Sequence, residues 1–252
     1  MMKFHPLKCK VLQLGKNNPQ SRYYMHKEDG SLHKLESVDE EKDLGVHTDK
    51  NLNFTSHCEN KINTAMKMLR YIRHTFKYMD EEIFLLLYRS LVRPHLEFCS
   101  TVWSPYLKYN KDAVERVQRR ATKMVPTLKD LSYTERLQRL KLETLEYRRR
   151  RADLLEAYRI INNIHSIDQN CHCSLCPDKT MFPPTLARNT RGHPKKIQVQ
   201  HATGIRKHFF STRVTPLWNN LTTKTVNSRN INIFKNNLNH ELLNKYTYTF
   251  SY

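Results

Sequence analysis

The sequence predicts an α+β fold that is mainly helical, with a small β-rich segment first, then a helical bundle and a basic helical C-terminal module. Three observations predict this order. Apolar residues lie near a period of two only in residues 1–50. From residue 55 onward they recur every three or four positions, the spacing of one helix face. Cationic residues dominate the end of the chain. We therefore expect four parts, at residues 1–50, 51–165, 166–200 and 201–252.

The β-rich segment contains one clear hairpin signal. Asp29-Gly30 suits the positive φ angles of a tight turn, and strands are expected on either side of it, over residues 23–25 and 32–35. A third strand is expected over residues 42–47. Two or three short strands do not make a self-sufficient sheet, so the chain looks as if it begins inside a domain.

Helical periodicity begins at Thr55 and runs to Phe76. A second helix is expected to begin at Asp80, whose carboxylate can accept the free amides of the first turn, and Pro94 should kink or end it. A third helix is predicted over residues 111–125, and Pro126 stops it. Its core face consists of Val114, Val117, Ala121 and Met124.

Two helix starts are marked by capping residues. Ser132 and Glu135 form the pattern of a capping box, which predicts a short helix through Leu140. Thr144 is expected to cap a longer helix that ends near Asn163. Residues 166–200 then show no sustained period and read as an irregular linker, whereas helical patterns return over residues 209–221 and 231–242.

The charge balance narrows the function classes. The chain has 252 residues with 43 Lys and Arg against 24 Asp and Glu, a formal net charge of +19. Such a surplus argues against an ordinary enzyme surface and favours a polyanionic partner, because cations beside phosphates release condensed counterions. A Gly-rich phosphate loop is absent from the sequence, which argues against a nucleotide-binding α/β fold. No apolar run is long enough to span a bilayer.

The cationic residues concentrate in two stretches. Residues 115–151 hold 12 Lys and Arg against 5 acidic residues, and residues 181–252 hold 11 against Glu241 alone. A solubilising face would mix the two signs more evenly. We therefore predict phosphate contacts from the third helix and the tail. The candidate residues are Arg116, Arg119, Arg120 and Lys123 in the helix, and Arg206, Lys207 and Arg213 in the tail.

Other candidate sites have simpler interpretations. Cys171, Cys173 and Cys176 are the only metal-like cluster, but zinc sites need four convergent ligands and a fourth is not evident, so we predict no metal site. Large aromatic residues could stack on bases, yet their helical spacing favours core packing. These aromatic residues are Tyr71, Phe76, Phe209, Phe210 and Trp218.

Several short motifs, in the same order along the chain, resemble the reverse transcriptases of non-LTR retrotransposons (LINEs) of the jockey and chicken-repeat type. Residues 8–19 resemble the strand that follows the catalytic hairpin in that family, and Leu44-Gly45-Val46 resembles the primer-grip segment between palm and thumb. Agreement continues in most of the later chain and is interrupted at residues 171–184. The further matching segments are residues 88–97, 103–106, 114–123, 190–193, 209–214, 217–219 and 234–235.

The resemblance implies that the β-rich segment is a palm remnant, that the bundle is a thumb-like domain, and that the chain clamps RNA, DNA or an RNA–DNA duplex. It also implies that Gly45 lets the main chain approach the primer end. Such polymerases hold two metal ions on paired aspartates, and no Asp-Asp pair occurs in this sequence. We therefore expect an RNA-directed DNA polymerase fragment without catalytic residues, inactive alone and needing no cofactor.

Three alternatives stay open at this stage. The chain could belong to a complete reverse transcriptase whose catalytic part lies outside it. It could be a decayed copy, or a co-opted, non-enzymatic protein-interaction module. The first ten residues, 1–10, lack the continuous apolar stretch of a secretory signal. We therefore expect an intracellular protein, nuclear or cytoplasmic, that is not secreted and has no membrane partner.

Overall fold

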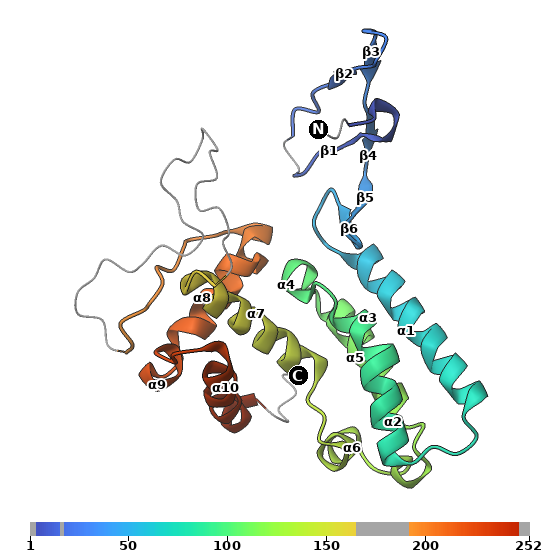
Figure 1. The fold of residues 1–252 in the computed structure, drawn as a ribbon, viewed down its shortest axis with the longest axis vertical. Helices are drawn as coiled ribbons and strands as arrows, with labels where there is room; N and C mark the ends of the chain where they lie inside the picture. Colours follow the sequence, from blue (N-terminus) through green and yellow to red (C-terminus); the bar gives the residue numbers. More distant parts are fainter. Residues whose placement is uncertain (1–3, 16–17, 165–191, 247–252) are drawn as a thin grey trace.

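The structure is a computed structural model that describes residues 4–15, 18–164 and 192–246. It is an α+β fold, mainly helical, with its short strands at the N-terminal end (Figure 1). The strands are β1 (Lys10–Leu12), β2 (Tyr24–His26), β3 (Leu32–Lys34), β4 (Glu36–Val38), β5 (Glu40–Asp43) and β6 (Val46–Asp49). A short 3₁₀ turn, η1 (Pro6–Lys8), precedes β1.

The six strands form three separate two-stranded pairs. β2 and β3 pair antiparallel with Met25 opposite His33, which confirms the hairpin predicted around Asp29-Gly30. β1 and β4 pair in parallel. The expected single strand over residues 42–47 is wrong, because the chain reverses there and β5 pairs antiparallel with β6. Leu44 and Gly45 form the two-residue turn, with φ angles of +44° and +87°.

The first helical part is built on α1 (Thr55–Thr75), which lies beside α5 (Lys108–Thr122) and α3 (Arg93–Glu97). Its core includes Cys58 of α1 and the predicted Val117 and Ala121 of α5, all buried. The other elements of this part are α2 (Glu81–Leu87), η2 (Tyr88–Val92), α4 (Ser100–Trp103), η3 (Pro126–Leu128) and α6 (Tyr133–Leu140).

Pro94 does not end the second helix. The chain continues helically from α2 through η2, a π-helical turn, into α3, and the Arg93 amide donates to the Tyr88 carbonyl five residues earlier. Pro94 therefore lies directly after the π-helical turn, at the start of α3, and the helical path continues past it to Glu97.

The capping predictions are confirmed. The Ser132 side chain accepts from the Glu135 amide and the Glu135 carboxylate accepts from the Ser132 amide, which makes the capping box of α6. The Thr144 side chain accepts from the Tyr147 amide and opens α7 (Leu145–Ile161). Both segments begin at the residues that the sequence marked.

A second core forms where α7 meets the C-terminal helices. Tyr158, Trp218 and Phe234 are buried there together, and the Tyr158 ring stacks on Phe234 at 4.2 Å between centroids. The second core begins within α7, at Tyr147, whereas the sequence placed a boundary between residues 165 and 166. The C-terminal elements are η4 (Gly204–His208), α8 (Phe210–Asn219), α9 (Thr223–Val226) and α10 (Ile231–Tyr246).

The described part of the expected linker packs against α8. Asn219 bonds the backbone of Ile197 in both directions, at 2.9 Å and 2.8 Å, and His193 lies buried with Nε2 3.0 Å from the Trp218 carbonyl. Residues 192–200 are therefore tied to the second core. Cys171, Cys173 and Cys176 lie outside the described residues.

The aromatic residues divide into two groups. Trp218 is buried and Phe210 packs on the second core, as predicted. The core prediction is wrong for Tyr71, Phe76 and Phe209, which are 61%, 38% and 41% exposed. Tyr71 projects from the outer face of α1, while Phe76 and Phe209 lie just beyond helix ends. Among the described residues, no helix combines the length and apolar character needed to cross a membrane.

Candidate nucleic-acid interface

A basic groove lies between the C-terminal halves of α1 and α5. Its volume is about 610 Å³, and half of the side chains that line it are cationic. Its cations are Arg70, Arg73, Lys77, Arg120, Lys123 and Lys129, and its apolar residues are Met66, Leu69, Phe76, Met79, Met124 and Pro126. We call this the α1–α5 groove. Among the described residues that line it, none carries a carboxylate.

Helix packing places these cations together. Ala65 and Leu69 of α1 are buried in the same core as Val117 and Ala121 of α5. Arg73 lies one turn beyond Leu69 and Arg120 lies next to Ala121, so both basic side chains emerge where the packed faces end. The two helices finish at neighbouring places, Thr75 and Thr122. Their cations therefore gather along one rim.

The helix ends also account for part of this charge. Arg73 and Arg120 lie in the last turns of α1 and α5. The free carbonyls of a helix C-terminus carry negative partial charge, which stabilises nearby cations by about 0.3–1 kcal/mol at exposed sites. This effect holds a cation at one helix end. The helix C-termini do not explain why six cations surround the apolar side chains that form the floor of the groove.

The groove cations are available to a ligand. Within the described part of the chain, none of the six forms an ion pair or a side-chain hydrogen bond, and Arg70, Arg73 and Arg120 are all exposed. An anionic ligand would therefore not have to displace an internal carboxylate.

The four cations predicted on the third helix separate into two pairs. Arg120 and Lys123 line the α1–α5 groove. Arg116 is exposed outside it. The Arg119 guanidinium lies over the Tyr133 ring, 5.0 Å from its centroid. The four positions follow the i, i+3, i+4, i+7 spacing of one face about 100° wide, and of these residues only Arg120 and Lys123 line the groove.

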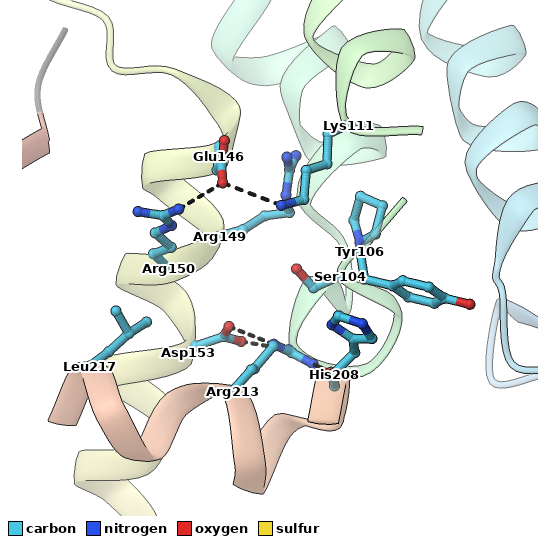
Figure 2. A pocket seen from close by; sticks show the side chains of 11 residues that line it. Ser104, Tyr106, Lys111, Glu146, Arg149, Arg150, Asp153, His208, Arg213 and Leu217 are labelled. Atoms are coloured by element: carbon cyan, nitrogen blue, oxygen red, sulfur yellow. Dashed lines mark hydrogen bonds and ion pairs between the residues drawn. The ribbon is translucent and has the colours of Figure 1, made fainter. Parts of the chain in front are cut away.

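The tail candidates also separate. Arg206 and Lys207 are exposed in η4, far along the chain from the groove residues. Arg213 is bound inside the protein, where its guanidinium forms an ion pair with Asp153 (Figure 2). It also donates to the carbonyls of Thr101 and His208. This arginine is fully used within the fold, so we do not retain it as a phosphate contact.

Gly45 makes a close approach inside the chain. A Cβ atom at this position would lie 3.2 Å from Cε1 of Phe98, a residue that follows α3. The absence of a side chain therefore lets the β5–β6 turn lie against the Phe98 ring. Its positive φ of +87° also favours glycine. The residue joins the β-rich segment to the first helical part and lies outside the groove.

Sequence reasoning missed four groove cations, Arg70, Arg73, Lys77 and Lys129, and it favoured core packing over base stacking for Phe76. A signal for three of them was present. Arg70, Arg73 and Lys77 are spaced by three and four residues, which is the spacing of one helix side. Arg70 and Arg73 lie in α1, and Lys77 follows two residues after its end. Their convergence with Arg120 required the packing of α1 on α5, which periodicity alone does not give.

No protein-family model matches this chain, and no curated protein or solved structure is significantly similar to it. In the described residues, no group of three or more His, Cys, Asp or Glu side chains is arranged to hold a metal ion. The features of this chain that indicate a function are its ordered sequence motifs and the cations of the α1–α5 groove.

Proposed function

We propose that this chain is the C-terminal part of a non-LTR retrotransposon reverse transcriptase, with the end of the palm, the thumb and the C-terminal region, and that it binds nucleic acid through the sugar–phosphate backbone. The ordered motifs support the family. The α1–α5 groove supports the binding, with Arg70, Arg73, Arg120 and Lys123 as its main contacts.

The observation that carries this proposal is the composition of the groove. Six cations with no carboxylate between them match a polyanion, and each phosphate that they neutralise releases condensed counterions. Because phosphates carry no base identity, binding should be nearly indifferent to sequence.

The apolar floor favours a strand with unpaired bases over a simple inorganic anion. Phe76 offers a ring face beside Met79 and Met124. Stacking of a base on an aromatic side chain is worth about 1–3 kcal/mol and tolerates any base. The cations would hold the backbone while one or two bases rest on the floor, which suits a template strand next to a duplex.

The test is a salt titration of binding. Fluorescein-labelled 20-nucleotide RNA, DNA and RNA–DNA duplexes are titrated with the full chain at several KCl concentrations, and fluorescence anisotropy gives the dissociation constant. We expect the quadruple variant R70A/R73A/R120A/K123A to lower the slope of log affinity against log salt by about 3 to 4 units, at roughly 0.7–0.9 per lost contact.

A matched control separates the groove from net charge. The quadruple variant K27A/K34A/K224A/R229A removes the same charge from exposed positions outside the groove: Lys27 after β2, Lys34 in β3, Lys224 in α9 and Arg229 between α9 and α10. It should keep nearly the wild-type slope. Equal losses in the two variants would contradict a defined interface. If the groove variant binds nucleic acid like the wild type, the groove does not contact nucleic acid. It would then face solvent or bind a protein partner, as expected for a protein-interaction module.

Polymerase activity is the second arm. The sequence holds no Asp-Asp pair, so the chain alone should give no primer extension with Mg²⁺ or Mn²⁺ on RNA or DNA templates. Incorporation above background by a preparation free of other polymerases would overturn this part of the proposal.

A further inference from the structure

A second polar cavity lies at the other end of α5, between the first and second cores. Figure 2 shows it enclosed by the turn after α4, the start of α5, the face of α7 and the segment from η4 to α8. Its volume is about 260 Å³. We call it the α7 pocket. Its cations are Arg149, Lys111, Arg150 and Arg213, and its carboxylates are Glu146 and Asp153.

Arg149 is the unusual group in this pocket. The residue is only 3% exposed, and among the described residues its Nη1 atom has no hydrogen-bond partner. Burial lowers the pKa of this guanidinium below its usual value. Glu115, Glu146 and Asp153 lie near enough to favour the charged form, but Nη1 has no acceptor among the described residues. Figure 2 shows its side chain reaching from α7 to the side where Lys111 lies.

The carboxylates of the pocket are already engaged. Glu146 pairs with Arg150 at 2.9 Å and with Lys111 at 3.5 Å. Burial raises the pKa of Glu146, but Lys111, Arg150 and Arg149 together outweigh it and hold the pKa below the ordinary value. Asp153 pairs with Arg213 at 2.8 Å. Four cations therefore face two carboxylates, and no carboxylate of the described residues lies within ion-pair distance of Arg149.

Neutral hydrogen-bonding groups complete the lining. Ser104 contributes a hydroxyl group, and the His208 ring stacks on Tyr106 at 4.3 Å between centroids. Burial, together with Lys207, Lys111 and Arg213, lowers the pKa of His208, so its imidazole is neutral near pH 7. It can then donate from one ring nitrogen and accept at the other. The pocket thus joins surplus positive charge to neutral donors.

We propose that the α7 pocket binds the phosphate group of a phosphomonoester, with Arg149 and Lys111 as its main ligands. A phosphomonoester carries about −1.5 to −2 charges at pH 7. That charge matches the surplus of two cations in the lining. The planar guanidinium binds phosphate oxygens in bidentate fashion. Arg149 Nη1 is shielded from solvent, so it would gain a phosphate oxygen as acceptor only when the atoms that cover it shift.

The shape of the site separates a monoester from a backbone diester. A terminal phosphate can enter a cavity from one side, whereas the two chains attached to a phosphodiester must leave the cavity in two directions. Lys111 lies twelve residues before Lys123 on one helical stretch, which is roughly 18 Å at 1.5 Å per residue. The α7 pocket is therefore distinct from the α1–α5 groove, and the two proposals can fail separately.

The experiment measures ligand-dependent thermal stability of the full chain. Inorganic phosphate, adenosine 5′-monophosphate and adenosine are compared at constant ionic strength maintained with KCl. We expect the melting temperature to rise in a saturable way with phosphate and with the monophosphate, and to stay constant with adenosine, because only ligands that bind the native state stabilise it. A rise with the monophosphate alone would assign the site to nucleotides, and a rise with both to the phosphate group itself.

Two variants test the named ligands. R149M should abolish the phosphate-dependent rise, and its ligand-free melting temperature shows whether the variant folds without the charge that acts on Glu115 and Glu146. K111M changes a half-buried residue and should weaken phosphate affinity at least tenfold, the equivalent of a hydrogen bond to a charged group at about 1.5–3 kcal/mol. If R149M does not fold, K111M decides.

Matched controls and contrary outcomes complete the test. K224M removes an exposed lysine elsewhere, and R120A changes the groove; both should keep the full phosphate-dependent rise. The proposal is overturned if neither phosphate nor the monophosphate produces a saturable rise in wild type, or if folded R149M and K111M respond like wild type. A phosphate response that survives in R149M but disappears in R120A would place the anion in the groove instead.

Discussion

The guanidinium of Arg213 in α8 holds both carboxylate oxygens of Asp153 in α7, with Nη2 to Oδ1 at 2.8 Å and Nε to Oδ2 at 2.9 Å. Burial raises the pKa of this carboxyl, and hydrogen bonds and charge from Arg213 oppose that rise. The same guanidinium donates to the Thr101 carbonyl in α4 at 2.6 Å. One side chain therefore connects the second core to the first.

Breaking this pair should destabilise the protein strongly. R213M leaves Asp153 buried without its partner, so we expect the free energy of unfolding to fall by about 3–5 kcal/mol in urea titrations. The double variant D153N/R213M should recover part of the loss, because it leaves no unpaired charge. A stable R213M protein with weaker nucleic-acid binding would instead make Arg213 a phosphate contact.

Gly45→Ala should cost more than Gly30→Ala. Both glycines lie in hairpin turns with positive φ, +87° and +80°, but an added Cβ at Gly45 meets the Phe98 ring at 3.2 Å and one at Gly30 meets nothing within 4 Å. The strained φ costs about 1–2 kcal/mol at either position. The difference between the two variants, measured by chemical unfolding, should shrink when Phe98 is also changed to Ala.

The basic residues of α5 should not contribute equally to nucleic-acid binding. R120A/K123A removes two groove contacts, and the salt slope should fall by roughly 1.4–1.8 units. R116A/R119A removes the same charge outside the groove, and the slope should hardly change. Anisotropy titrations at several salt concentrations compare the two proteins. Equal slopes for both pairs would indicate that charge acts over the whole helix.

Acidification should destabilise the protein through His57. Its ring is fully buried 4.8 Å from Trp103, and burial, with Lys61 and His47 nearby, lowers its pKa to about 4. Unfolded histidine titrates near 6.5. Between those pH values only the unfolded state binds the proton, so stability falls as pH drops from about 6.5 to 4, by up to about 3 kcal/mol.

The H57Q variant isolates this contribution. His193 and His208 also have lowered pKa values, so the informative quantity is the wild-type free energy of unfolding minus that of H57Q. That difference should decrease between pH 7 and pH 4. A difference that is constant with pH would show that His57 does not titrate in this range.

Much of the helical part was predictable because its signals are local. Ser132 and Thr144 mark the starts of α6 and α7 by a chemistry that needs only the next three residues. Trp218 was correctly placed in a core, since its helical neighbours share its apolar face. Such features depend only on residues close together in the chain, so they can be predicted from the sequence.

The errors arose where distant segments decide the outcome. Leu44 adopts a positive φ and is 88% exposed. A leucine between two β-prone stretches predicts neither property. Phe76 fits the apolar face of α1 by spacing, yet it lies past the helix end and lines a groove. The groove and the α7 pocket both need helices packed against each other. Periodicity tells which face is apolar but not which partner covers it.

The π-helical turn at Tyr88–Val92 explains an apolar repeat that would not suit an ordinary α-helix. Phe84, Tyr88, Val92 and Leu96 are all buried and are spaced by exactly four residues. With 3.6 residues per turn, each step of four drifts by about 40°, so the last residue would face away from the first. The wider i→i+5 turn takes up that drift. Deleting the exposed Ser90 would return the segment to α-helical winding, and the eleven steps then left between Phe84 and Leu96 bring Leu96 within about 20° of the face of Phe84, so the residues after the deletion should keep their register with the core.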